Sequence, residues 1–169
     1  MKNIILIGMP GAGKSTVGVV LAKTLGWDYV DTDLVLQKRE GLLLQEIIDA
    51  QGITNFLRIE EAVLQDFNQQ RCVVATGGSV VYSSKAMQHL QAMGTMVYLQ
   101  LPINTIKERL TNMSSRGIAM SEGQSLQTLY NERVPLYEKY ADVVLDCSGQ
   151  DVEAIVEVVK KKIKEIESP

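Results

Sequence analysis

Short apolar runs alternate along the chain with longer segments whose apolar residues recur every three or four positions. The runs cover residues 4–7, 29–30, 73–75, 96–99 and 143–145, and each precedes a turn signal and a segment of helical period. The first, third and fourth runs are apolar without interruption, as in strands that are covered on both faces. The alternation predicts an α/β fold in which a parallel sheet lies between two layers of helices.

Two segments depart from this alternation. Residues 32–70 are mostly of helical period and are longer than a minimal crossover between strands. Residues 111–125 are polar with little periodicity, which indicates a mobile loop over a functional site; a disordered surface excursion is the alternative. Because there is no linker, residues 1–169 are predicted to form a single domain.

Charge and composition narrow the class of protein. A net charge of −3 gives no basic surface to bind a nucleic-acid backbone. The first apolar run is far shorter than the ~20 residues that cross a membrane, and no signal-peptide cleavage site follows it. Cys72 and Cys147 stand far apart in apolar surroundings, as buried thiols do in a reducing compartment. A cytoplasmic protein with neither membrane nor nucleic-acid partner is expected.

The first predicted strand runs into a phosphate-binding loop. Residues 8–15 read Gly-Met-Pro-Gly-Ala-Gly-Lys-Ser, which is a glycine, four residues and Gly-Lys-Ser, and an amphipathic helix follows. Glycines let backbone N–H groups approach phosphate oxygens, and a helix N-terminus adds partial positive charge. A turn without a ligand needs neither the lysine nor the hydroxyl. The predicted nucleotide site comprises Gly11, Ala12, Gly13, Lys14, Ser15 and Thr16, with Lys14 on the β- and γ-phosphates and Ser15 on Mg²⁺.

Further polar residues fall at the carboxyl edge of the predicted sheet, where open α/β sheets bind ligands. Asp31 and Asp33 close the second strand, and their spacing puts both carboxylates on one side if the strand persists. One could hold Mg²⁺ through water, and the other could take a proton from an acceptor hydroxyl. An Asx turn with a helix N-cap is the alternative, but it needs one aspartate only. Residues 76–79, Thr-Gly-Gly-Ser, follow the third strand and form either a ligand-binding loop or a plain turn.

Three arginines are candidates for contacts with ligands. Arg116 lies in the polar loop, whose closure could bring its charge to the transferring phosphoryl group. Arg133 follows on a helix and could bind phosphate or an acceptor carboxylate. Arg109 could lie flat against adenine. A solvated surface position is the alternative for each. Together with the aspartates they predict an ATP-dependent kinase of a small hydroxylated metabolite.

These residues resemble the shikimate kinase family over nearly the whole chain. The shared motifs are residues 8–16, 31–33, 52–61, 75–78, 116–118 and 133–137. The resemblance implies a P-loop, NMP-kinase-like three-layer sandwich with a five-stranded parallel sheet in the order 2-3-1-4-5. It also implies an acceptor-binding segment at about 32–70 and a lid at about 111–125. The implied reaction converts shikimate to shikimate 3-phosphate with ATP and Mg²⁺, by a protein that is expected to be a monomer.

Roles follow from the resemblance position by position. Ser15 would ligate Mg²⁺, Asp31 would contact it through water, and Asp33 would bind the acceptor hydroxyl and assist its deprotonation. Lys14 and Arg116 would act with Asp33 in catalysis. The other implied contacts are those of Arg109 and the lid residue Arg116 with the nucleotide, and those of Gly77, Gly78 and Arg133 with the acceptor.

The chain departs from the family's pattern at four positions, all near the acceptor. The family usually has Gly-Glu-x-x-Phe-Arg, where the arginine binds the carboxylate of shikimate, but Ile53 and Leu57 stand in place of the glutamate and the arginine. Arg58 is a candidate replacement, although one step along a helix turns a side chain by about 100°. Ser79 replaces a glycine and Gly117 a proline.

The departures leave three functions open. The acceptor is shikimate, or it is a different small alcohol that meets an apolar wall at Leu57. A nucleotide-binding module without catalysis is the third possibility, and the presence of Asp33, Arg116 and Arg133 speaks against it.

Overall fold

The sheet is the centre of the structure, a computed structural model that describes residues 2–111 and 117–168. Its five strands are parallel and lie in the order β2-β3-β1-β4-β5. They are β1 (Asn3–Ile7), β2 (Asp28–Asp31), β3 (Cys72–Ala75), β4 (Gly94–Gln100) and β5 (Val143–Asp146). All five predicted strands and their predicted order are confirmed.

Burial along the strands follows their place in the sheet. Every residue of β1 and β3 is buried, and β4 is buried except near its ends. The edge strand β5 alternates between buried and exposed residues, and β2 is only half-buried. Uninterrupted apolar runs therefore mark the three central strands, as predicted, because a central strand needs apolar side chains on both faces.

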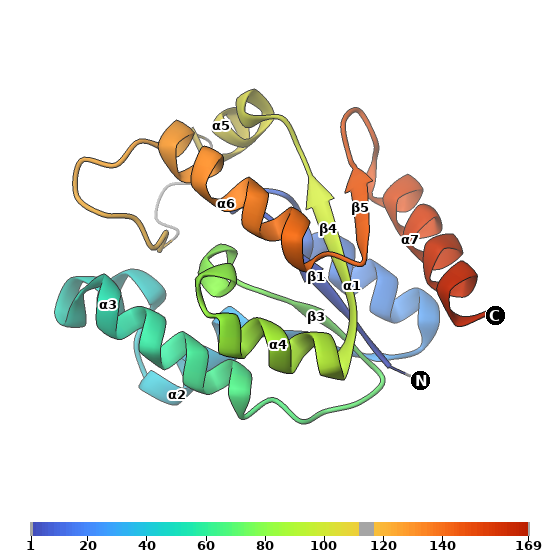
Figure 1. The fold of residues 1–169 in the computed structure, drawn as a ribbon, viewed down its shortest axis with the longest axis horizontal. Coiled ribbons are helices and arrows are strands. Elements are labelled where there is room, and N and C mark those ends of the chain that lie inside the picture. The colour runs from blue at the N-terminus through green and yellow to red at the C-terminus, as the bar shows by residue number, and fades with distance from the viewer. Residues whose placement is uncertain (1, 112–116, 169) are drawn as a thin grey trace.

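Helices cover both faces of the sheet (Figure 1). On one face α1 packs against α7, and on the other α3 packs against α4, with α6 beside them. Both cysteines are buried and free, as predicted. The bounds of these helices are α1 (Lys14–Leu25), α3 (Leu44–Gln65), α4 (Ser84–Met93), α5 (Ile103–Thr111), α6 (Leu126–Tyr140) and α7 (Val152–Glu167).

The segment between β2 and β3 forms a helical lobe beside the sheet. It holds α2 (Thr32–Glu40) and α3, and α3 bends at Gly52, whose φ of 78° and ψ of 166° are not helical. Both helices lie in the segment that was predicted to be helical. The lobe has a small core of its own, formed by Leu36, Ile47, Phe56, Val63 and Ala119. Because Ala119 belongs to the predicted lid, this part of the lid segment packs on the lobe.

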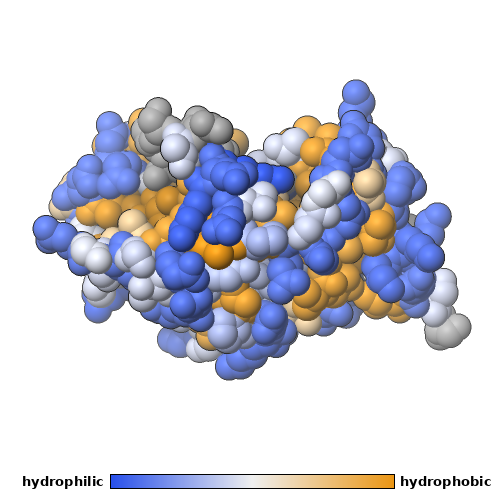
Figure 2. All heavy atoms as spheres, turned by 90° about the horizontal axis from the view of Figure 1, so that it is seen from above, coloured by the Kyte–Doolittle hydropathy of each residue, from blue (hydrophilic) through white to orange (hydrophobic). Residues whose placement is uncertain are grey.

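Figure 2 shows a surface of mixed polarity, with apolar atoms visible both at the end where Figure 1 places the start of α3 and in the opposite half of the molecule. Leu34 and Leu43, which belong to the helical lobe, are 60% and 61% exposed. Within the described ranges, the structure contains no helix of the length and apolarity that crossing a membrane requires.

Candidate active site

A phosphate-binding loop joins β1 to α1. Gly8, Gly11 and Gly13 all have positive φ, and Gly13 caps α1 in the left-handed region without a side-chain hydrogen bond. These conformations suit glycine best, which explains the spacing of the motif. The first N–H groups of α1 have no partner within the helix, so the loop is a binding site for an anion.

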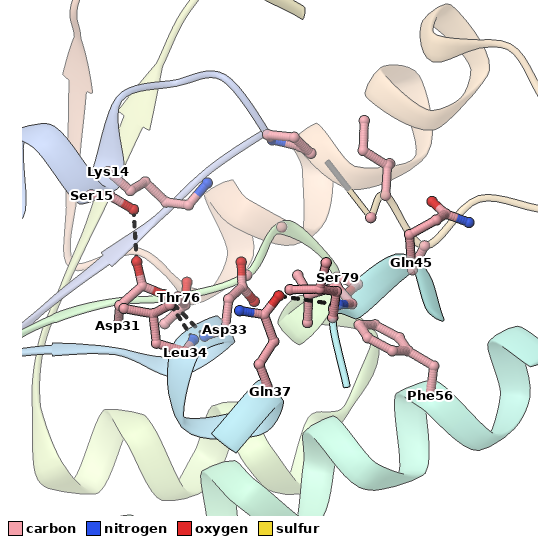
Figure 3. A pocket seen from close by; sticks show the side chains of 18 of the residues that line it. Lys14, Ser15, Asp31, Asp33, Leu34, Gln37, Gln45, Phe56, Thr76 and Ser79 are labelled. Atoms are coloured by element: carbon pink, nitrogen blue, oxygen red, sulfur yellow. Dashed lines mark hydrogen bonds between the residues drawn. The ribbon is translucent and has the colours of Figure 1, made fainter. Parts of the chain in front are cut away.

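Lys14 is the first residue of α1 and is only 7% exposed. Its ammonium group donates hydrogen bonds to the carbonyl oxygens of Gly8, at 2.7 Å, and Met9, at 2.8 Å. The side chain therefore bends over the loop, on the side of the cavity described below (Figure 3).

Asp31 uses its two carboxylate oxygens for different purposes. Oδ2 accepts hydrogen bonds from Ser15 Oγ, at 2.9 Å, and from Tyr29 Oη, at 3.3 Å. Oδ1 accepts from the backbone N–H groups of Asp33 and Leu34 and thereby caps α2. The capping interpretation is thus correct for Asp31, and it does not exclude the contact with Ser15.

Asp33 does not lie on β2, because the strand ends at Asp31 and α2 begins at Thr32. The prediction that both aspartates share one side of an extended strand is therefore wrong. The first turn of α2 nevertheless brings the Asp33 carboxylate to the cavity, below Lys14 in Figure 3. A Cβ atom on Gly77 would lie 2.7 Å from Asp33 Oδ1, so only glycine lets this carboxylate lie against the loop after β3.

A cavity of about 510 Å³ extends from the phosphate loop to the helical lobe. Its size suits a small metabolite together with part of a nucleotide. It brings together most of the predicted site. Its walls come from the phosphate loop, α1, α2, α3, the loop after β3, residues 117–119 of the predicted lid and α6. They include Lys14, Ser15, Thr16, Asp31, Asp33, Phe56, Gly77, Gly78, Ser79, Ile118 and Arg133.

Arg133 is the only arginine among the described residues that line this cavity. Only 1% of it is exposed. Its Nη2 donates to the carbonyl oxygen of Ala119, at 2.7 Å, and its Nε donates to Tyr82 Oη, at 3.1 Å. None of the three ion pairs found in the described part of the chain involves it. A buried guanidinium without a carboxylate partner favours an anionic ligand, because burying an uncompensated charge is costly.

The loop after β3 is fixed closely around Arg133. A Cβ atom on Gly78 would lie 2.8 Å from Arg133 Nη1 and 2.8 Å from Cδ of Pro10. Tyr137 on α6 donates a hydrogen bond of 2.6 Å to the Gly78 carbonyl oxygen. The second glycine of the Thr-Gly-Gly-Ser run is therefore required for the close approach of the guanidinium to the cavity wall.

Glu60 and Ser79 form a buried pair that the residue patterns did not single out. Ser79 Oγ lies 2.8 Å and 3.0 Å from the two carboxylate oxygens of Glu60, which is 4% exposed. Burial raises the pKa of Glu60 to about 8, and the charge of Asp33 raises it further; the hydrogen bond from Ser79 and the positive charge of Arg133 act in the opposite direction. The available signal was a carboxylate on an apolar helix face, four positions after Phe56 and four before Leu64.

Arg58 and Leu57 lie outside the main cavity. Arg58 is exposed, and both residues line a separate depression of about 130 Å³ on the other side of the Glu60–Ser79 pair. Leu57 packs against the core of the helical lobe. The structure thus does not bring Arg58 to the predicted acceptor site, because the turn of the helix directs it elsewhere, and Leu57 does not form an apolar wall of the cavity.

The two remaining predicted arginines differ in what the structure describes. Arg109, at the end of α5, donates a hydrogen bond of 3.0 Å to the carbonyl oxygen of Gly11. It therefore lies against the phosphate loop, next to the predicted nucleotide. Arg116, the predicted lid arginine, falls outside the described residues.

Comparisons with known proteins match the chain to one family over nearly its whole length. A sequence model of the family described as Shikimate kinase matches residues 10–164. A shikimate kinase of Thermodesulfovibrio yellowstonii is 40% identical over 99% of this chain and 96% of its own length. The structure of a shikimate kinase from Acinetobacter baumannii in complex with shikimate superposes with a TM-score of 0.93 and 27% identity, and covers 100% of this chain and 96% of that one. A shikimate kinase from Aquifex aeolicus gives a TM-score of 0.83 at 29% identity, over 98% of both chains.

Proposed function

The chain belongs to the shikimate kinase family, and from this premise we propose that it transfers the γ-phosphoryl group of ATP to shikimate. The products are ADP and shikimate 3-phosphate, and the reaction serves the biosynthesis of aromatic amino acids. The relative whose structure contains shikimate covers this whole chain, which supports shikimate over another small alcohol. The enzyme is an ATP-dependent phosphotransferase with an alcohol group as acceptor.

One observation carries the proposal: a single cavity is lined by an anion-binding loop, by Asp33 and by a buried arginine that forms no ion pair among the described residues. The loop and Lys14 suit the β- and γ-phosphates of ATP. Arg133 suits the carboxylate of shikimate. A molecule held by Arg133 presents its hydroxyl groups to Asp33 and to the phosphates.

Asp33 acts as the base of the reaction. Its carboxylate binds the attacking hydroxyl and accepts the proton as the oxygen–phosphorus bond forms, while the bond from the γ-phosphorus to the leaving oxygen of ADP breaks. Because phosphoryl transfer requires little covalent chemistry from the protein, the enzyme accelerates it mainly by positioning the two substrates and by neutralising charge on the phosphates. Lys14 neutralises charge on the phosphates, and Arg109 contacts the adenine side of the nucleotide. Arg116 is proposed to neutralise charge on the transferring phosphoryl group, and this assignment rests on its position in the sequence alone.

The oxygen atoms around Ser15 fit a magnesium ion. Ser15 Oγ and Asp31 Oδ2 lie 2.9 Å apart at the mouth of the phosphate loop, and Mg²⁺ prefers oxygen ligands and retains several waters. Ser15 would be a direct ligand, and Asp31 would hold a coordinated water. When bound, the ion neutralises charge on the β- and γ-phosphates.

One cationic side chain, that of Arg133, is assigned to the carboxylate of the acceptor. Arg133 has five N–H donors, of which two are used by Tyr82 and Ala119, so three remain for the carboxylate of shikimate. Gly77 and Gly78 line the same region. Arg58 has no part in this site, because it lies outside the cavity.

The enzyme is proposed to act as a monomer in the cytoplasm. The two free, buried cysteines fit a reducing compartment.

The test is ADP release in a coupled assay, with the phosphorylated product identified by mass spectrometry. Wild-type enzyme is expected to turn over with shikimate in the presence of Mg²⁺ and ATP. Asp33→Asn is expected to lower kcat by about 10²- to 10⁴-fold, because the base is lost, while ATP binding measured by calorimetry changes little.

Asp28→Asn is the matched control, since Asp28 is an exposed aspartate on the same strand-to-helix segment and should leave turnover unchanged. Absence of any phosphorylated shikimate with the wild-type enzyme would refute the proposed function. Undiminished turnover by Asp33→Asn would remove Asp33 from the mechanism only.

A further inference from the structure

The carboxylate end of the acceptor site depends on one arginine in this chain. Where the family usually supplies a second arginine, the chain has Leu57, and Arg58 is exposed outside the cavity. A single guanidinium forms a good bidentate contact only if its plane and its direction are fixed before the ligand arrives, since a free arginine side chain loses much rotamer entropy on binding. Residues that orient Arg133 therefore gain importance.

Two groups hold the guanidinium of Arg133 from opposite parts of the chain. The carbonyl oxygen of Ala119 accepts from Nη2, at 2.7 Å. Tyr82, the last residue of the 3₁₀ helix η1 (Gly78–Tyr82), accepts from Nε, at 3.1 Å. The centre of the guanidinium also lies 5.2 Å from the centroid of the Tyr82 ring, within the range of a cation–π contact.

We propose that Tyr82 is a positioning residue of the acceptor site, which holds the guanidinium of Arg133 so that its remaining N–H groups face the acceptor carboxylate. Tyr82 does not line the cavity; it lies behind it, among the residues of the 130 Å³ depression. Its action on the acceptor therefore passes through Arg133. This inference rests on the proposed function, because it assigns the anion at Arg133 to the carboxylate of shikimate.

The chemistry of the phenol fits this role. Burial raises the pKa of Tyr82, and hydrogen bonding and charge from Glu132 also raise it, while Arg133 lowers it. The net direction is upward, so the phenol stays neutral near pH 7. A neutral phenol accepts a hydrogen bond from Nε without forming an ion pair, and it leaves the positive charge of Arg133 for the ligand.

The 3₁₀ helix η1 links Tyr82 rigidly to the cavity wall at Gly78. Gly78 and Tyr82 are the two ends of η1, and the Gly78 carbonyl oxygen is held by Tyr137 from α6, the helix that carries Arg133. The wall of the cavity, the arginine and the residue behind it therefore belong to one hydrogen-bonded unit.

Tyr82→Phe tests the inference, because it keeps the ring and removes the acceptor of the Nε hydrogen bond. We expect KM for shikimate to rise about tenfold, with kcat and KM for ATP nearly unchanged. With shikimate methyl ester, in which the acceptor carboxylate is neutral, the variant and the wild type should have the same KM. A merely structural role would not distinguish the acid from the ester.

Tyr130→Phe is the matched control. Tyr130 is another partly buried tyrosine, on α6, and its hydroxyl donates to the carbonyl oxygen of Leu101, away from Arg133. It should leave KM for shikimate unchanged, and melting temperatures will show that both variants fold.

The outcomes separate the two proposals. If wild-type enzyme phosphorylates shikimate but Tyr82→Phe has an unchanged KM for shikimate, or the same loss with acid and ester, the positioning role is refuted and the proposed function stands. If the wild type does not phosphorylate shikimate, the proposed function fails and this inference fails with it.

Discussion

The two carboxylates near the proposed acceptor site, those of Asp33 and Glu60, lie in different surroundings. Asp33 lies at the cavity in the first turn of α2, while Glu60 is buried behind the cavity wall and touches Ser79. Both approach Gly77, since a Cβ atom there would lie 2.7 Å from Asp33 and 2.9 Å from Glu60. Two close carboxylates do not ionise independently, and the more buried one keeps its proton. Glu60 is therefore the protonated member of this pair.

The buried carboxyl makes stability depend on pH. Glu60 has a folded-state pKa of about 8, above the ordinary value of a glutamate, so the native state retains a proton that the unfolded chain loses. The free energy of unfolding should therefore fall as pH rises from about 4.5 to about 8. Glu60→Gln cannot ionise and should show a flatter profile, so that its stability relative to the wild type increases with pH. Urea unfolding at a series of pH values measures this.

Glu153→Gln serves as the control for that experiment, because Glu153 is an exposed glutamate. Its unfolding free energy should run parallel to that of the wild type. Parallel profiles for Glu60→Gln and the wild type between pH 5 and pH 8 would contradict the protonated state of Glu60.

Residues 117–119 of the predicted lid pack closely against the helical lobe. A Cβ atom on Gly117 would lie 2.6 Å from Leu44 Cβ and 2.7 Å from the backbone nitrogen of Gln45. Residues 117–119 line the cavity, and Ala119 accepts the hydrogen bond from Arg133. The glycine that replaces the family's usual proline thus lets this segment rest on the start of α3.

Gly117→Ala should separate the segment from α3. We expect kcat/KM for shikimate to fall about 10- to 100-fold, because small displacements of positioning groups are costly in catalysis, while nucleotide affinity is nearly retained. Steady-state kinetics and ADP binding measure the two effects. Ser121→Ala, an exposed change in the same loop, is the control. Wild-type kinetics in Gly117→Ala would show that the close contact has no role in catalysis.

At the scale of the whole molecule, the two proposed ligands would contact different elements. The nucleotide would contact the phosphate loop and α1, and the acceptor would contact α2, η1 and α6. Each ligand should therefore stabilise the fold without the other. At 100 times its Kd, either Mg-ADP or shikimate should raise Tm by about 5 to 10 °C. Thermal scans with each ligand alone and with both provide the measurement, and a shikimate shift that requires nucleotide would contradict separate sites.

Local patterns were sufficient to predict the strands and the phosphate loop, whereas the order of the strands was predicted from the family resemblance. Uninterrupted apolar runs mark the central strands, and the phosphate loop needs glycines, a lysine and a hydroxyl at fixed spacing. The acceptor half depends on contacts between distant segments. No local pattern shows that Tyr82 reaches Arg133, 51 positions later, or that Ser79 binds Glu60. The placement of Asp33 was mispredicted in its local structure because Asp31 ends the strand by capping α2.

The order of the strands has a consequence for synthesis of the protein. The strand that enters the exit tunnel first, β1, becomes the central one, and Ile4 finally lies beside Val73 and Thr95. An apolar, β-branched segment must therefore wait for its first partner strand until residues 72–75 are made and for its second until residues 94–100 are made. Such non-local pairing is slow and exposed to aggregation. We expect ribosome-bound intermediates shorter than β4 to need chaperones, and to be unable to bind nucleotide.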